Sequence, residues 1–358
     1  MADDDIPSLD AVEGWPLPES QTHWYGAPAA ELTLRDALAS GRMHHAWLVT
    51  GPRGSGKATL AYRLARYALT HARPNPPTEG DATLDVDPES RVFRQIAARG
   101  HPNVITLQRP WDDKLKRYKT ELTVDEVRRI QGFFGSTAGE AGWRICIVDT
   151  ADELNPNAAN ALLKMLEEPP QRSLFLLLAA RPGKLLPTIR SRCRRLDLPP
   201  LPVEAIETAF RDHGERASTA DIHLAAALAN GSLRRAILLL QGDGVDTYRD
   251  FQEIVARLPD IDYRGVHLLA DRVSARGDED AYVGFLDGLE GWLSRRVRGE
   301  PEPNGVPVAP AVSAASLATW ADVWEKAAET TFQAEELNLD RKQVVLQIFM
   351  TLAHAARM

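Results

Sequence analysis

Residues 30–198 alternate short, continuously apolar runs with longer segments whose apolar residues recur at helical spacing. The apolar runs predict β-strands at 46–50, 104–107, 143–149 and 174–180, and a last strand is expected at 193–198. Helices are predicted between them at 31–40, 58–70, 90–99, 123–134 and 155–168, with a short helix or turn at 185–189. Continuous apolar strands that alternate with helices are typical of a parallel sheet covered on both faces, so an α/β fold is expected.

The strand pattern stops at the proline-rich segment 199–202. Three short helices are predicted beyond it, at 203–213, 219–229 and 232–241, followed by a linker at 242–244. The remaining sequence is helical except for a proline-rich loop at 299–310, and helices at 317–332 and 339–354 close the chain. Their aromatic residues are expected to be helical core, not a ligand site: Trp320, Trp324, Phe332 and Phe349. The pattern predicts three parts: an α/β domain at 1–198, a three-helix segment at 199–244 and a helical domain at 245–358.

Three further segments carry no strong element pattern. Residues 1–30 hold several prolines and acidic residues, which predicts a loosely held N-terminal segment. Residues 73–88 are rich in Pro, Asp, Thr and Glu and predict an exposed insertion. Residues 111–118 are expected to form a charged loop.

A phosphate-binding loop pattern follows the first predicted strand directly. It has the form Gly, four residues, Gly-Lys, and consists of Gly51, Pro52, Arg53, Gly54, Ser55, Gly56 and Lys57. Glycines let successive backbone N–H groups point at one anion, and the helix that begins near Lys57 adds the positive end of its dipole. A working loop places Ser or Thr after the lysine as a magnesium ligand, but Ala58 stands there. Thr59 cannot easily replace it, because one helical residue rotates the side chain by roughly 100°.

Asp149 ends the third predicted strand and is the candidate for the carboxylate that holds magnesium beside such a loop. The next residue is Thr150, where hydrolytic members of this class usually carry a Glu that polarises water. Asp149 could instead only cap the segment that follows. The sequence therefore indicates a nucleotide-binding fold and also indicates that its catalytic groups are incomplete.

Composition narrows the classes of partner. The chain has 42 Lys and Arg against 50 Asp and Glu, a net charge of −8, so any contact with DNA is expected to be local or shared with partners. Cys146 and Cys193 are the two cysteines and provide neither a disulfide framework nor a zinc set. No run approaches the ~20 apolar residues of a membrane span, and a cytoplasmic location is expected.

Four sequence segments together resemble the AAA+ clamp-loader subunits of bacterial DNA polymerase III. They are GRMHHAWLVTGPRGSGK at 41–57, HPNV at 101–104, NAANALLKMLEEPP at 157–170 with TIRSRC at 188–193, and GSLRRA at 231–236. The resemblance runs from about residue 40 to 241. It implies a RecA-like AAA+ domain, a small helical lid and a C-terminal helical collar domain that joins a ring of subunits.

The family contains ATP-hydrolysing subunits, gamma and tau, and a non-hydrolysing type, delta prime. This chain lacks the hydroxyl after Lys57, the Glu after Asp149 and the hydroxyl that the hydrolysing subunits carry at the position of Ala179-Ala180. The resemblance therefore implies the delta-prime type, which assembles with gamma or tau and with delta to place the sliding clamp on primed DNA. ATP or ADP could still bind without being hydrolysed. Two alternatives stay open: an active gamma-type ATPase, which ATP turnover by the isolated chain would reveal, and a small-molecule P-loop kinase.

Two arginines match the functional positions of this family. Arg192, in Ser-Arg-Cys, matches an arginine finger that reaches the ATP of a neighbouring subunit, although with Arg190, Arg194 and Arg195 it could be an ordinary basic surface. Arg234, in GSLRRA, matches the sensor 2 arginine of the lid. Many clamp-loader subunits carry a four-cysteine zinc module after the phosphate-loop helix, but residues 71–100 contain no cysteine, so no metal is expected. The two Glu at 167–168 are unfavourable at a helix C-terminus, which suggests that this helix end is constrained by a neighbour or by DNA.

Overall fold

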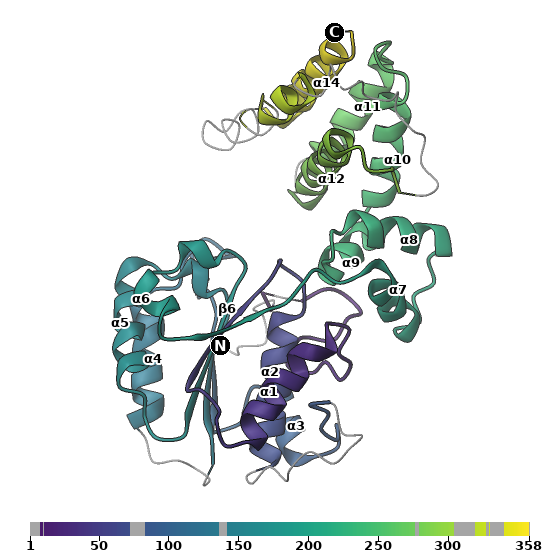
Figure 1. Ribbon diagram of the computed structural model, residues 1–358. Helices are drawn as coiled ribbons and strands as arrows, with labels where there is room; N and C mark the ends of the chain where they lie inside the picture. The colour runs from purple at the N-terminus through teal and green to yellow at the C-terminus, as the bar shows by residue number, and fades with distance from the viewer. Residues whose placement is uncertain are drawn as a thin grey trace. The chain divides into compact units, whose positions relative to one another are not determined.

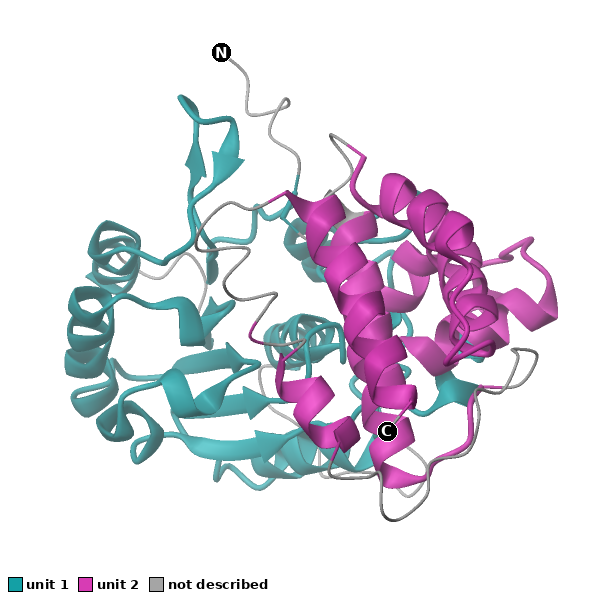
Figure 2. Cartoon of the chain, turned by 90° about the horizontal axis from the view of Figure 1, so that it is seen from above, with its two compact units in different colours: residues 1–209, 231–233 teal, residues 210–230, 234–358 magenta. Residues whose placement is uncertain are grey.

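The computed structural model describes residues 8–9, 11–71, 83–135, 142–275, 279–303, 319–326, 329 and 340–357 (Figure 1). The chain divides into two compact units, which Figure 2 distinguishes by colour. Unit 1 comprises residues 1–209 with 231–233, and unit 2 comprises residues 210–230 with 234–358. The division into three parts expected from the sequence stays a prediction.

Unit 1 is built on a five-stranded sheet with the strand order β2-β5-β6-β1-β7. All four neighbouring pairs are parallel. The strands are β1 (Ala46–Thr50), β2 (Val104–Leu107), β5 (Arg144–Val148), β6 (Ser173–Ala179) and β7 (Arg194–Asp197). Each observed strand begins and ends within two residues of its predicted bounds, so the expected parallel sheet is confirmed.

Helices cover both faces of this sheet (Figure 1). One face carries α1 (Pro28–Ala39), α2 (Lys57–Thr70) and α3 (Arg91–Ala97), and the other carries α4 (Val124–Gly135), α5 (Pro156–Glu167) and α6 (Pro187–Arg190). Successive strand side chains point to opposite faces. In β1, Trp47 and Val49 join the core beneath α1 and α2, whereas Ala46 and Leu48 join the core beneath α4 and α5.

Within the N-terminal segment that was expected to be loosely held, 1–30, residues 19–22 are packed against α2. Two buried arginines of α2 hold its backbone. Arg66 donates to the carbonyls of Glu19 at 2.8 Å and Gln21 at 2.7 Å, and Arg63 donates to the carbonyl of Thr22. Polar residues attach this segment, so its hydropathy carries no signal of packing.

Two other irregular segments also differ from expectation. The expected charged loop at 111–118 is a short antiparallel hairpin of β3 (Trp111–Asp112) and β4 (Arg117–Tyr118), in which the rings of Trp111 and Tyr118 pack edge to face. Of the expected insertion at 73–88, residues 73–82 lie outside the described part of the chain. Its remainder is anchored, because Leu84 is buried and Asp85 forms a 2.6 Å ion pair with Arg63.

The helices after the sheet begin with α7 (Val203–Asp212), and unit 2 has its own hydrophobic core. The others are α8 (Thr219–Leu228), α9 (Leu233–Gln241), α10 (Gly244–Val255), α11 (Tyr263–Val273), α12 (Glu279–Arg298) and α14 (Arg341–Ala356), and residues 319–326 are also helical. The expected linker at 242–244 is shorter than predicted, because α10 already begins at Gly244. Trp320 and Phe349 are buried as predicted and Trp324 packs against the core at its edge. Phe332 lies outside the described residues.

None of the described helices is both long enough and apolar enough to cross a membrane.

Candidate functional site

The phosphate-loop sequence forms the turn between β1 and α2 in unit 1. Gly51 has φ +154° and Gly56 has φ +87°, which are conformations that residues with a side chain rarely adopt. Space excludes side chains at both positions as well. A Cβ at Gly51 would lie 2.6 Å from the carbonyl oxygen of Leu198, and one at Gly56 would lie 2.9 Å from the indole of Trp24. The glycines are therefore required by this loop geometry.

Lys57, at the start of α2, is folded back onto its own loop. Its ammonium donates to the carbonyls of Gly51 at 2.8 Å and Pro52 at 2.6 Å. Burial lowers the pKa of the amine from 10.5 to about 8, an effect partly opposed by the carboxylates of Asp149 and Asp152. The amine thus has an internal set of acceptors that a phosphate group would have to replace.

Two further loop residues differ in their surroundings. The guanidinium of Arg53 forms a 2.7 Å ion pair with Glu153, whose other carboxylate oxygen lies 3.2 Å from Arg109. Ser55 is buried, and its hydroxyl oxygen has no hydrogen-bond partner within the described parts of the chain. The loop therefore presents an unused hydroxyl and a lysine held by replaceable acceptors, which fits a bound phosphate.

The magnesium half of the site is incomplete in three dimensions. Ala58 and Thr59 lie in the first turn of α2, so no hydroxyl directly follows Lys57. Asp149 follows β5, and one carboxylate oxygen accepts a hydrogen bond from Gln108 at 3.2 Å. Thr150, with φ +57°, donates its hydroxyl to the backbone carbonyl of Asp149 at 2.6 Å. The residues present could hold phosphates, but they provide one carboxylate for a metal and no carboxylate at position 150 to polarise water.

Asp152 and Ala180 show how the neighbouring catalytic positions are occupied. The carboxylate of Asp152 accepts the backbone N–H groups of Ala180 at 3.2 Å and Arg181 at 3.0 Å. It therefore fixes the chain just after β6, where ATP-hydrolysing relatives were expected to carry a hydroxyl. This buried carboxylate has a structural role that accounts for both of its oxygens.

Trp24 is a residue of the loop surroundings that the sequence pattern did not reveal. Its indole lies against Gly56, and its ring nitrogen donates to the carbonyl of Ala27 at 3.3 Å. One aromatic residue in a polar N-terminal segment carries no periodic signal. Only the contact in the folded chain shows that it belongs to the loop.

Arg192 lies just after α6, where its side chain is held at two points. One guanidinium nitrogen donates to the carbonyl of Thr188 at 3.0 Å, and the other terminal nitrogen lies 2.6 Å from the carboxylate of Glu167. The side chains of Arg192 and Glu167 remain 36% and 43% exposed. Glu167 ends α5, so this pair connects the two predicted functional segments that follow β5 and β6.

The adjacent arginines have different environments, so they do not form one uniform basic surface. Arg194 places its guanidinium over the ring of Trp47, 4.8 Å from the centroid, and Arg195 pairs with Asp197 at 2.6 Å. Arg190 is exposed at the end of α6. Arg192 is the member of this group that is tied to α5.

The expected sensor 2 segment, 231–236, begins beside the phosphate loop in unit 1, but Arg234 belongs to unit 2. Leu233, the residue before it, donates its backbone N–H to the carbonyl of Gly54 at 3.2 Å. Arg234 follows in α9, and one of its terminal nitrogens is buried without a hydrogen-bond partner in the described part of the chain. Its approach to a nucleotide stays a prediction.

A groove of ≈300 Å³ lies between α4 and α5. Its lining is polar and partly basic: Val124, Arg128, Gln131, Asn157, Asn160, Ala161 and Lys164. Within the described residues, no group of three or more His, Cys, Asp or Glu side chains is placed to hold a metal ion.

Comparison with known proteins finds a family model that matches the sheet domain. Residues 26–202 match the family model described as DNA polymerase III, delta subunit. The delta-prime subunit of Pseudomonas aeruginosa is 38% identical over 149 residues, which cover 42% of this chain and 41% of that protein. The Escherichia coli delta-prime subunit is 35% identical over 205 residues, 57% of each chain. The chain thus spans about half the length of the curated relatives it matches first.

The similarity extends to the gamma and tau subunits. The E. coli tau subunit is 30% identical over 258 residues, which cover 68% of this chain and 36% of tau. Among solved structures, a DNA polymerase III gamma subunit-related protein of Thermotoga maritima covers 91% of this chain and 100% of its own, at 16% identity and a TM-score of 0.47. Through its sheet domain, the chain is similar to the delta-prime and gamma/tau subunits of DNA polymerase III.

Proposed function

We propose that this protein is a delta-prime-type clamp-loader subunit that does not hydrolyse ATP itself and supplies Arg192 to the ATP site of a neighbouring subunit. It would act in a hetero-oligomer with gamma or tau and with delta, which together load the sliding clamp onto primed DNA. The observation that carries this proposal is the incomplete metal site, in which Ala58 follows Lys57 and Thr150 follows Asp149. ATP or ADP could occupy the loop without turnover.

The contacts of these residues support the loss of hydrolysis. Gln108 donates to one carboxylate oxygen of Asp149, and the Thr150 hydroxyl donates to the backbone carbonyl of Asp149, so position 150 offers no carboxylate to polarise water. Phosphoryl transfer depends on positioning and on charge stabilisation, both of which a metal ion with two protein ligands provides. A loop that keeps its lysine but lacks the hydroxyl therefore retains affinity for phosphate with little rate enhancement.

Arg192 has the properties that a group acting on a neighbour requires. A guanidinium is always charged, and its planar fork matches phosphate oxygens. Its side chain is partly exposed and is not buried in its own core. Arginine fingers contribute about 10³–10⁵ in rate in NTPases, so even a partial role is measurable.

The experiment that tests the proposal compares the isolated chain with the reconstituted complex. We expect no ATP turnover by the isolated chain above that of its Lys57→Ala variant. In a complex with gamma or tau and delta, Arg192→Ala should preserve assembly and lower DNA-stimulated ATPase by about tenfold or more. Arg190→Ala serves as the matched control because Arg190 lies close by in sequence and lacks the Glu167 contact. Robust turnover that depends on Lys57 would favour the gamma-type alternative.

The groove between α4 and α5 supports a DNA-facing role for α5. Asn157, Asn160 and Lys164 are spaced by three and four residues, so they share one face of α5, and Arg128 of α4 lies in the same groove. Amide and cationic side chains are the usual donors to phosphate oxygens. Lys164→Ala should weaken the stimulation by primed DNA at low salt, and its difference from the unaltered complex should shrink as salt rises, because a lost phosphate contact lowers the salt dependence of binding.

A further inference from the structure

The carboxylate of Glu167 is the strongest local partner of Arg192. The two side chains meet at 2.6 Å, and they come from the end of α5 and from the segment after α6. Two negative residues at a helix C-terminus are unfavourable for the helix dipole. The ion pair gives one of them, Glu167, a reason to be there, because its charge is used outside the helix.

The backbone that carries Glu167 is itself fixed. The ring nitrogen Nε2 of His45 donates to the carbonyl of Leu166 at 3.1 Å. His45 directly precedes β1, the strand that leads into the phosphate loop. Burial lowers the pKa of His45, with the neighbouring His44 adding to the effect, so the neutral imidazole is favoured at neutral pH. The last turn of α5 is thus anchored to the sheet next to the residue that contacts Arg192.

The second contact of Arg192 limits its orientation further. One terminal nitrogen donates to the carbonyl of Thr188, in the same turn, and the other contacts Glu167. Two fixed acceptors on different nitrogens define both the position and the plane of a guanidinium. A partly exposed ion pair contributes little to stability, so stability alone does not account for this geometry.

We infer that Glu167 is a positioning residue, which holds the Arg192 guanidinium in the orientation from which it reaches the neighbouring subunit's ATP. This inference rests on the proposed function of Arg192. In this inference Glu167 acts through the arginine, which it contacts directly. A flexible arginine would have to lose its conformational freedom at each turnover, whereas a held one has already lost it.

The test uses the reconstituted complex with Glu167→Gln, which keeps the size of the side chain and removes its charge. We expect DNA-stimulated kcat to fall by about tenfold, with KM for ATP and assembly nearly unchanged, because orientation affects the transition state more than binding. Glu168→Gln, one residue along the same helix end, is the matched control and should retain full activity. Glu167→Asp should recover part of the loss.

A double variant separates this inference from the proposal beneath it. If Glu167 acts through Arg192, Glu167→Gln with Arg192→Ala should be no slower than Arg192→Ala alone. If Arg192→Ala has no effect on the complex, the finger itself is wrong. If Arg192→Ala is slow and Glu167→Gln matches the unaltered complex, the finger stands and the positioning role is wrong. A Glu167→Gln effect that adds fully to that of Arg192→Ala would also overturn it.

Discussion

Lys57 shows how one residue links the geometry of the loop to a measurable pH dependence. The pKa of its amine is lowered from 10.5 to about 8 by burial, so the folded chain releases this proton while the unfolded chain still holds it. Between pH 8 and about 10 the unfolded state binds more protons, and the free energy of unfolding should rise with pH by about 2–3 kcal/mol from this group.

Urea unfolding across that pH range measures the contribution of Lys57 to the free energy of unfolding. Lys57→Met removes the titrating amine, so the effect of Lys57 is the difference between the two proteins, while the remaining pH dependence is shared by both. That shared part falls with pH, because burial raises the pKa values of Cys146 and Cys193, which act within this range, and of Tyr62 and Tyr248, which act above about pH 10. Equal slopes for the two proteins would show that Lys57 titrates normally.

The sequence predicted the main chain of the loop well and its side-chain contacts poorly. The glycine spacing alone located the turn at Gly51–Gly56, because the backbone of this turn needs positive φ angles, which glycine adopts readily. The side-chain contacts are those of Lys57 with the loop carbonyls, Trp24 with Gly56 and Glu167 with Arg192. They join residues that are far apart in the sequence or that lie within the turn itself. Such pairs leave no periodic pattern, although the two adjacent glutamates at the end of α5 stand out in the sequence as unfavourable for the helix dipole.

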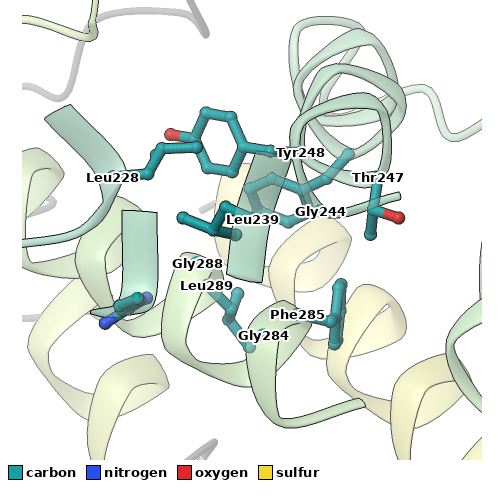
Figure 3. A pocket seen from close by; sticks show the side chains of 11 residues that line it. Leu228, Leu239, Gly244, Thr247, Tyr248, Gly284, Phe285, Gly288 and Leu289 are labelled. Carbon is teal, nitrogen blue, oxygen red and sulfur yellow. The ribbon is translucent and has the colours of Figure 1, made fainter. Parts of the chain in front are cut away.

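At the scale of elements, helix α12 contains a small defect that can be repaired. Gly284 and Gly288 line a cavity of ≈10 Å³ together with Tyr248, Phe285 and Leu289 (Figure 3). A Cβ at Gly284 would meet no atom within 4 Å, whereas one at Gly288 would lie 3.3 Å from the Tyr248 ring. Glycine inside a helix costs about 0.5–1 kcal/mol relative to alanine, so Gly284→Ala should stabilise the protein by that amount.

Gly288→Ala is the matched control for this substitution. It gains the same helix propensity but must displace Tyr248, so its stabilisation should be smaller or absent. Tyr248 cannot move freely, because its hydroxyl donates to Glu302 at 3.0 Å and accepts from Arg295 at 2.6 Å. Thermal unfolding of the two variants checks the order, and a larger gain for Gly288→Ala would contradict the assignment.

Elements with strong periodicity were predicted, and elements held by polar contacts were not. The three strands β1, β5 and β6 follow from their apolar runs, since burial on both faces leaves a continuous hydrophobic segment, whereas β7 at the sheet edge is mostly exposed and polar. The β3–β4 hairpin and the packed N-terminal segment were missed. Each is fastened by an aromatic pair or by buried arginines, such as Arg63 and Arg66, whose partners are backbone carbonyls.

On the scale of the whole molecule, the hydrophobic cores follow the division into units. Two cores lie on the faces of the sheet in unit 1, and a third lies among the helices of unit 2. None of these three cores, as defined over the described residues, draws side chains from both units. Cores that share no side chains are expected to melt as separate cooperative units.

Calorimetry of the full chain should therefore resolve two transitions that respond to different substitutions. Glu31 forms a 2.8 Å ion pair with Arg63, and both side chains are almost fully buried, so Glu31→Gln removes one of the two carboxylates that pair with Arg63 in unit 1, the other being Asp85. Loss of a charged hydrogen-bond partner at a buried site costs about 1–3 kcal/mol, which should lower one transition by roughly 2–12 °C. Gly284→Ala should raise the other and leave the first unchanged. If both substitutions instead displace a single shared transition, the two units unfold as one cooperative unit and the independence of their cores is wrong.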